Sequence, residues 1–156
     1  MKPFALYSTK SGNTQKIAQE IASELACNSL RIGQVSQIPI VDLKDFDLIF
    51  VGTGIYWGNP NSDLERFLEK TDLKNRKQFA LFLTWGGAGK TDQAALTKLS
   101  AILEAKGHHV KGEKFQCYGG RRFTILRRGH PDEKDAQDAK IWARKVANDA
   151  FETDAK

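Results

Sequence analysis

The sequence has little of what marks a secreted, membrane-spanning or metal-binding protein. Its 156 residues include two cysteines, Cys27 and Cys117, which lie far apart and in no metal-ligand spacing. This excludes a disulfide framework and fits a reducing compartment. No apolar run is long enough to cross a bilayer, and the first residues lead directly into an apolar segment, which leaves no room for a signal peptide. We therefore expect a single cytoplasmic domain, residues 1–156.

Acidic residues are outnumbered, since 24 Lys and Arg stand against 19 Asp and Glu and give a net charge of +5. A basic protein is suited to an anionic ligand or an acidic partner. The basic residues are spread along the chain and mixed with acids, so we expect no nucleic-acid interface and no membrane binding. The tightest basic cluster consists of Arg121, Arg122, Arg127 and Arg128.

Short apolar runs alternate with amphipathic segments along the whole chain. Strands are expected at residues 4–6, 30–33, 48–52, 79–84 and 109–117, and helices at 17–25, from 62 or 63 to 68, at 94–106 and at 133–151. Residues 35–44 are expected to be an irregular connector, because Pro39 argues against regular structure. This alternation indicates an α/β fold with an open parallel sheet and helices on both faces. Five strands of this size suit the order 2-1-3-4-5.

The segment between the first strand and the first helix has the features of a phosphate-binding loop. Its hydroxyl groups are those of Ser8, Thr9, Ser11 and Thr14. The first N–H groups of a helix have no partner inside the helix and favour an anion in front of them. Gly12 permits a turn that a Cβ would obstruct. The alternative is a helix capped by Ser11 or Asn13, with no ligand.

The motif Thr9-x-Ser11-Gly12-x-Thr14 after a strand resembles the phosphate loop of flavodoxins, which hold flavin mononucleotide (FMN). The resemblance implies a flavodoxin-like three-layer sandwich, with a five-stranded parallel sheet of order 2-1-3-4-5 and helices on both faces. It covers nearly the whole chain as architecture. At the level of motifs it covers the first loop strongly, the loop around Trp57 well, and two later loops only in part.

In such a sheet the ligand lies beyond the carboxyl ends of the strands, where segments 8–14, 53–60 and 84–90 meet. Trp57-Gly58 resembles the flavodoxin loop in which an aromatic residue stacks on the isoalloxazine and a glycine flips its peptide toward the flavin N5–H. In that family the flip stabilises the one-electron-reduced form. Trp85 is the candidate for the second stacking residue, although the usual acidic and tyrosine residues of that loop are missing. The alternative is that both tryptophans pack against the hydrophobic core, anchor their loops there and contact no ligand.

The expected FMN-binding residues all come from these three segments. They are Ser8, Thr9, Lys10, Ser11, Gly12, Asn13, Thr14, Thr53, Gly54, Ile55, Tyr56, Trp57, Gly58, Thr84, Trp85, Gly86 and Gly87. No metal site is expected. Most flavodoxins are acidic, and surrounding acids disfavour the anionic reduced flavin. The positive charge of this chain therefore predicts a less negative second reduction potential than that of an acidic flavodoxin.

The loop from Tyr118 to Asp132 departs from a plain electron carrier. Its Arg-Gly-His-Pro-Asp-Glu segment looks like one found in flavodoxin-family proteins of anaerobic bacteria. Its arginines could attract an anionic substrate or an acidic partner, and His130, as a proton donor, is the candidate catalytic residue. The alternative is a solvated basic loop with a structural histidine, in which Asp132 caps the last helix. Cys117 is expected to be a small buried hydrophobe rather than a reactive thiol.

Two functions remain open within the flavin interpretation. We favour an electron-transfer protein that cycles FMN between its oxidised, semiquinone and hydroquinone states and meets a redox partner with an acidic surface. The alternative is a reductase, or reductase component, that acts on a bound small molecule with loop 118–132 as its lid. Segment 86–91 also resembles a nucleotide-binding P-loop, but Thr84 replaces the required first glycine. A receiver domain would need an aspartate where Gly52-Thr53 ends the third strand.

Overall fold

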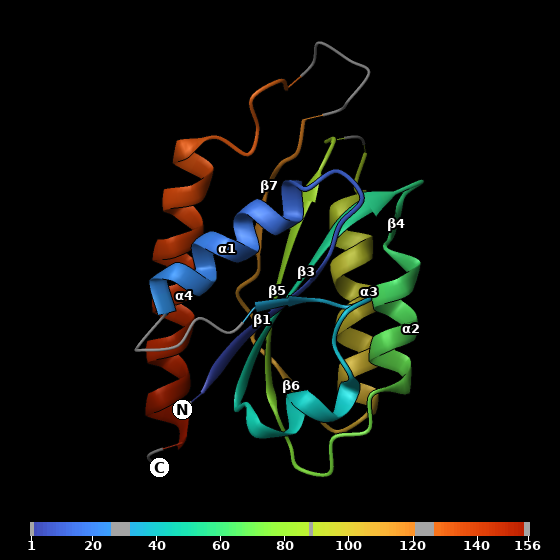
Figure 1. The fold of residues 1–156 in the computed structure, drawn as a ribbon, viewed down its shortest axis with the longest axis vertical. Coiled ribbons are helices and arrows are strands. Elements are labelled where there is room, and N and C mark those ends of the chain that lie inside the picture. The colour runs from blue at the N-terminus through green and yellow to red at the C-terminus, as the bar shows by residue number, and fades with distance from the viewer. Residues whose placement is uncertain (1, 26–31, 88, 121–126, 155–156) are drawn as a thin grey trace.

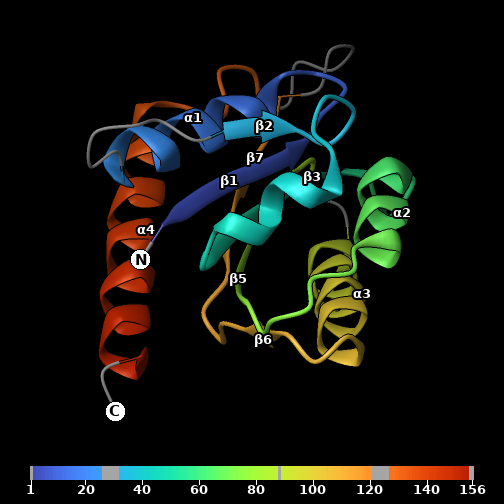
Figure 2. The ribbon, with the colours of Figure 1, turned by 60° about the horizontal axis from the view of Figure 1, so that its bottom comes forward.

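A parallel sheet stands between two layers of helices in the computed structural model, which describes residues 2–25, 32–87, 89–120 and 127–154 (Figures 1 and 2). The helices are α1 (Asn13–Leu25), α2 (Ser62–Lys70), α3 (Thr91–Ala105) and α4 (Glu133–Asp154). Helices α1 and α4 cover one face of the sheet, and α2 and α3 cover the other. The predicted flavodoxin-like three-layer sandwich is confirmed.

The strands follow the predicted topology. They are β1 (Pro3–Ser8), β2 (Ile32–Gln34), β3 (Leu48–Tyr56), β4 (Asn59–Pro60), β5 (Gln78–Trp85), β6 (His109–Val110) and β7 (Phe115–Tyr118). The order is β2-β1-β3-β5-β6, and β7 also pairs in parallel with β5. This matches the order 2-1-3-4-5 when β6 and β7 are counted together as the fifth strand. The central strands are buried on both faces, as is typical of a parallel sheet.

Two strand predictions were wrong in their extent. The region 53–56, predicted as a loop, continues β3 to Tyr56, and β4 then pairs antiparallel with its end. Trp57 and Gly58 form the turn of this hairpin with φ angles of 54° and 81°, the positive values that tight hairpin turns require. The predicted strand 109–117 is interrupted, because the polar segment between β6 and β7 leaves the sheet.

The helices begin close to the predicted positions, with two corrections. Helix α3 begins at Thr91 rather than residue 94, and the connector contains a 3₁₀ helix, η1 (Ile40–Asp45). Pro39 precedes η1, where a missing N–H and a fixed φ are tolerated, so it did not exclude regular structure. Asn61 caps α2 by accepting a hydrogen bond of 2.9 Å from the Asp63 N–H. No described helix has both the length and the apolar character to cross a bilayer.

Cys117 lies in β7 against α4 and is 7% exposed. Burial, together with the nearby carboxylates of Asp135 and Asp132, raises the pKa of its thiol from 9.0 to about 12. The thiol therefore stays neutral at any physiological pH. This agrees with the expectation of a small buried hydrophobe.

We expect Cys117 to resist alkylation. At pH 8 the raised pKa lowers the thiolate fraction roughly a thousandfold, and burial slows access further. Folding favours the neutral thiol, so its contribution to stability is complete below pH 9.0 and is lost as the pH rises toward 12. Iodoacetamide labelling of a Cys27→Ser variant, followed by mass spectrometry in buffer and in urea, measures this. Rapid labelling in buffer by a fully folded protein would contradict it.

Candidate functional site

The segments after β1, β3, β5 and β7 lie at the same end of the sheet (Figure 1). All three predicted binding segments are among them. This placement follows from the parallel pairing, because the carboxyl ends of neighbouring parallel strands share one edge. The arrangement therefore brings the predicted phosphate loop beside both predicted ring-binding loops.

The phosphate loop makes a tight turn into α1. Gly12 has a φ of +87°, and its N–H donates to Thr9 Oγ1 at 3.0 Å. A Cβ on Gly12 would meet nothing within 4 Å, so glycine is needed here for its backbone conformation and not for space. Asn13 does not cap the helix, since its side-chain amide donates to the Gly120 carbonyl at 3.2 Å. Ser11 is exposed, and its hydroxyl makes no hydrogen bond with the described residues.

Thr14 connects the phosphate loop to the end of β5. Its side chain is 1% exposed, and its hydroxyl lies 2.9 Å from the hydroxyl of Thr84. Thr53, equally buried, donates to the Gly54 carbonyl at 2.8 Å and accepts from the Asn61 N–H at 2.9 Å. These threonines were predicted to bind the cofactor directly. The structure places their hydroxyls in contacts within the protein, where they fix the positions of the loops.

Tyr56 connects the second predicted segment to the first. Its hydroxyl accepts a hydrogen bond of 2.8 Å from the backbone N–H of Lys10, whose ammonium lies 4.8 Å from the centroid of the Tyr56 ring. A Cβ on Gly54 would lie 2.7 Å from the Tyr56 hydroxyl, so glycine leaves room for this contact. Tyr56 was predicted in the site, but its contact with the phosphate loop was not.

The two predicted stacking residues lie in opposite environments. Trp57, at the tip of the β3–β4 hairpin, is fully exposed, so its indole is open to a planar ligand. The alternative that it plugs the loop against the core is wrong. Trp85 is partly buried against the core on the α2 and α3 face and stacks on Tyr118, with ring centroids 6.3 Å apart and an interplanar angle of 28°. The alternative interpretation, in which the tryptophan packs its loop against the core, therefore holds for Trp85.

The segment after β7 folds onto the segment after β5. Arg127 donates from Nη1 to the Gly86 carbonyl, and its guanidinium carbon lies 3.7 Å from the centroid of the Tyr118 ring. The N–H of Gly119 donates to the Trp85 carbonyl at 2.9 Å. The sequence predicted that the arginines of this loop attract an anionic substrate or an acidic partner, but it predicted neither the contact of Arg127 with Gly86 nor a role for Tyr118. Arg121 and Arg122 lie outside the described residues.

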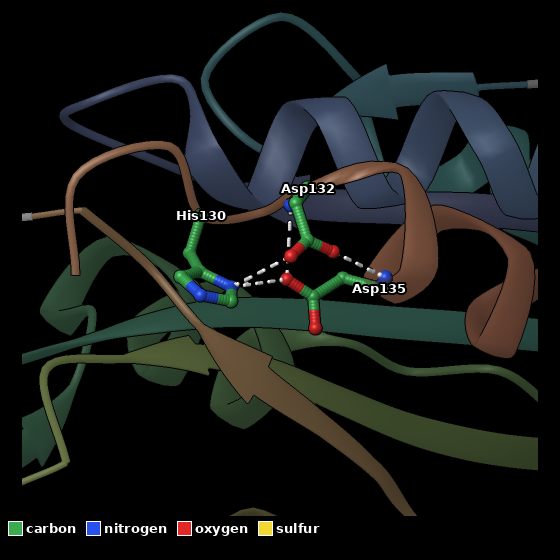
Figure 3. A group of neighbouring side chains, drawn as sticks. All are labelled: His130, Asp132 and Asp135. Atoms are coloured by element: carbon green, nitrogen blue, oxygen red, sulfur yellow. Dashed lines mark hydrogen bonds and ion pairs between the residues drawn. The ribbon is translucent and has the colours of Figure 1, made fainter.

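His130, Asp132 and Asp135 form a polar cluster at the start of α4 (Figure 3). His130 Nδ1 lies 2.6 Å from an Asp135 carboxylate oxygen and 3.6 Å from one of Asp132. Asp132 caps α4 as predicted, since the Asp135 N–H donates to its carboxylate at 2.9 Å. Hydrogen bonds from the backbone, first that of Asp135, hold the pKa of Asp132 below its usual value. These contacts give His130 a structural role beside any catalytic one.

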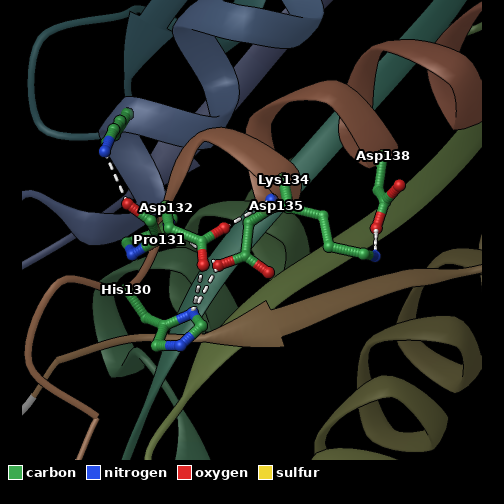
Figure 4. Close-up of polar contacts among 7 residues, drawn as sticks. His130, Pro131, Asp132, Lys134, Asp135 and Asp138 are labelled. Carbon is green, nitrogen blue, oxygen red and sulfur yellow. Dashed lines mark hydrogen bonds and ion pairs between the residues drawn. The ribbon is translucent and has the colours of Figure 1, made fainter.

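The same cluster anchors the segment before α4. Lys16 of α1 donates to the Pro131 carbonyl, and Lys134 pairs with Asp138 one turn further along α4 (Figure 4). The ligand-type atoms of His130, Asp132 and Asp135 lie within 4.8 Å of one another. The imidazole nitrogen of this group is already paired with the Asp135 carboxylate. The cluster is therefore accounted for by helix capping and the hydrogen bond between His130 and Asp135.

The residues present fit a phosphorylated planar cofactor. The open backbone at Gly12 and the hydroxyl of Ser11, which no described residue pairs, stand at the first turn of α1, where unpaired N–H groups favour a phosphate. Trp57 is fully exposed and so presents an indole face to solvent. Gly86 and Gly87 supply backbone groups beside the phosphate loop, because Thr84 just before them contacts Thr14. This donor set matches the phosphate, ring face and ring edge of FMN.

Comparison with known proteins points the same way. The family model described as flavodoxin domain matches residues 4–122. An uncharacterized protein from Methanocaldococcus jannaschii is 35% identical over 153 residues, which cover 94% of this chain and 98% of that protein. A solved flavodoxin from the domain Archaea has a TM-score of 0.77 at 20% identity and covers 97% of this chain and 99% of its own.

The structure of Fusobacterium nucleatum flavodoxin bound to FMN is also similar. It has a TM-score of 0.70 at 17% identity, over 96% of this chain and 99% of that one. At such identities the two solved structures show a common fold. The match to the family model and the 35% identity come from the sequence itself and so are a separate observation.

Proposed function

The chain belongs to the flavodoxin family, and we propose that it binds FMN and serves as an electron-transfer protein. One observation carries the proposal: the three segments expected to bind FMN contact one another at the carboxyl edge of the sheet. Tyr56 bonds to the phosphate loop, and Thr14 bonds to Thr84 at the end of β5. A related fold, that of the Fusobacterium flavodoxin, has been solved with FMN bound.

In this proposal each segment has a distinct task. The turn around Gly12 and the first N–H groups of α1 hold the phosphate, and Trp57 covers one face of the ring. The backbone of residues 84–87 holds the ring edge. When bound, FMN supplies one-electron and two-electron redox chemistry, while the protein supplies binding, orientation and electrostatics.

The proposed partner is a redox protein with an acidic surface. The net charge of +5 favours such a partner, because opposite charge steers encounter and raises the association rate. The fully exposed Trp57 lies at the tip of the β3–β4 hairpin and would place the ring near the protein surface. An accessible ring suits an electron carrier, which exchanges electrons with a partner and keeps no substrate enclosed.

A second function, reduction of a bound small molecule, is favoured by the segment after β7. Arg127 and Tyr118 reach over the segment after β5 and contact Gly86 and Trp85. A covering segment of this kind would shield a substrate beside the ring. Residues 121–126, which belong to the lid that the sequence suggested, lie outside the described residues.

The first test is retention of flavin by the purified protein. After incubation with FMN and gel filtration, we expect flavin absorbance to remain with the protein at a 1:1 ratio. Riboflavin should be lost under the same conditions, because it lacks the phosphate that the turn around Gly12 binds. Equal retention of riboflavin and FMN, or retention of neither, would contradict the proposal.

A matched pair of glycine variants links that retention to the phosphate loop. Gly12→Val should weaken FMN binding at least about tenfold, because a β-branched residue is strained at a φ of +87°. Gly112→Val is the control, since Gly112 is exposed, outside the site and free of neighbours within 4 Å. Fluorescence titration of FMN gives both dissociation constants. Unchanged affinity of a folded Gly12→Val protein would remove the phosphate-loop assignment.

A further inference from the structure

We propose that Arg127 sets the reduction potential of the bound flavin, as a fixed cation that favours the two-electron-reduced, anionic ring over the oxidised ring. This inference rests on the proposed FMN binding. It assigns to one residue an effect that net charge alone would spread over the whole surface. Three features of the structure carry it: the position of the guanidinium, its lack of a carboxylate partner, and its rigidity.

The position of Arg127 follows from its contacts. Its Nη1 donates to the carbonyl of Gly86, in the middle of the segment proposed to hold the ring edge. A Cβ on Gly87 would lie 1.5 Å from the same nitrogen, so the side chain rests directly against the backbone of that segment. A guanidinium carries five N–H donors, and the carbonyl uses one nitrogen of the fork. The remaining donors and the charge stay available at the edge of the site.

Within the described ranges, no carboxylate forms an ion pair with the guanidinium of Arg127. The carboxylates of Asp132 and Asp135 are engaged with His130 and with the first turn of α4, and no described ion pair joins Glu133 to Arg127. An unpaired cation in partly buried surroundings interacts more strongly with a nearby anion than an exposed ion pair does.

The side chain of Arg127 is held from both sides. Its guanidinium stacks on Tyr118, which in turn stacks on Trp85. Its backbone carbonyl accepts from the His130 N–H at 3.3 Å, while the His130 carbonyl accepts from the Gly120 N–H at 2.8 Å. A cation fixed in this way cannot move away when the charge of the ring changes. The interaction is therefore in place before reduction.

The electrostatic effect has a definite sign. Two electrons and one proton convert the neutral oxidised ring into a reduced ring with one negative charge. A nearby cation stabilises that product and leaves the neutral oxidised ring almost unaffected. By linkage, the cation strengthens the binding of reduced FMN relative to that of oxidised FMN, and the midpoint potential rises in proportion to the logarithm of that change in the affinity ratio.

The experiment compares Arg127→Gln with Arg128→Gln in the FMN-loaded protein. Arg128 is adjacent and exposed, its side chain makes no hydrogen bond, ion pair or ring contact with the described residues, and it carries the same charge. Dithionite supplies the two electrons and is itself oxidised to sulfite, water supplies the proton, and a reference dye reports the potential. We expect Arg127→Gln to lower the preference for reduced FMN about tenfold, which is about 30 mV for a two-electron couple. Arg128→Gln should change it less than threefold.

Oxidised FMN binding distinguishes charge from packing. We expect Arg127→Gln to bind oxidised FMN almost as tightly as the unmodified protein. Equal loss of affinity for both redox states, with no change in potential, would overturn the proposal. Arg127 would then serve only to hold the segment after β7 against the segment after β5. Equal shifts in the Arg127 and Arg128 variants would also overturn it, because net charge would then explain both.

A second variant keeps the proposal testable if Arg127→Gln does not fold. Arg127→Lys retains the charge but loses the planar fork that stacks on Tyr118 and reaches Gly86. We expect it to lower the preference for reduced FMN about threefold, with no change in Arg128→Lys. Identical potentials in both lysine variants would overturn the proposal. Failure of the unmodified protein to retain FMN would instead contradict the proposed function.

Discussion

Replacing Trp142 by alanine is expected to lower the free energy of unfolding by about 4 kcal/mol, the largest stability effect that we predict. The indole on α4 is 5% exposed and meets three aromatic rings from three strands. Its centroid lies 5.5 Å from that of Phe50, 6.5 Å from that of Phe82 and 5.7 Å from that of Phe115. The truncation would therefore remove the largest side chain that α4 contributes to this core cluster.

Urea denaturation followed by circular dichroism measures this loss. The urea concentration at the midpoint of unfolding should fall. The slope of the unfolding free energy against urea concentration should stay the same, because the fold itself does not change. In a domain of this size the melting temperature should fall by roughly 8–16 °C. A loss below about 1.5 kcal/mol would show that neighbouring side chains fill the space of the indole, contrary to the close packing described here.

Trp142→Phe provides the matched control. The indole Nε1–H is buried and has no hydrogen-bond partner among the described residues. A buried donor without a partner is itself destabilising, so its removal offsets part of the lost ring volume. We expect Trp142→Phe to cost less than about 1.5 kcal/mol. A cost equal to that of alanine would show that the indole donor is paired in solution.

The layered fold was predictable from the sequence because each layer leaves a local pattern. Buried parallel strands read as apolar runs such as 48–52 and 79–84, and the helices read as apolar stripes between them. The end of β3 beyond Gly52 was missed because the glycines on either side of Thr53, Gly52 and Gly54, also favour loops. In the structure all three continue the pairing with β5, so neighbouring strands decide what local propensity leaves open.

The candidate site was predictable only in its local parts. The phosphate loop lies within seven residues, and its glycine, hydroxyls and helix start all appear in the sequence. The contacts between loops leave no local signal: Thr14 meets Thr84, and Arg127 meets Gly86, across long separations in the chain. Arg127 and Arg128 are identical neighbours in sequence. The positive φ of Arg127, 66°, accompanies the turn that directs only one of them to the site.

Gly52→Ala is expected to lower the free energy of unfolding by about 3 kcal/mol, although it adds one methyl group. Gly52 lies in the middle of the sheet, paired with Tyr7 of β1 and Phe82 of β5. A Cβ there would lie 2.1 Å from the nearest atom of the Phe82 ring, which is fully buried and packs on Trp142. The ring cannot yield without disturbing α4.

Gly112→Ala separates this clash from the general effect of replacing a glycine. A Cβ on Gly112 meets nothing within 4 Å and the backbone there does not need a positive φ, so we expect a change within about 0.5 kcal/mol. Parallel urea titrations give both values. If the two variants were equally stable, Phe82 would have to move freely in the core. In that case the adjacent loop, and not packing, would explain why residue 52 is a glycine. A much larger loss of stability in Gly52→Ala than in Gly112→Ala would show that a side chain at residue 52 clashes with Phe82 beneath the site.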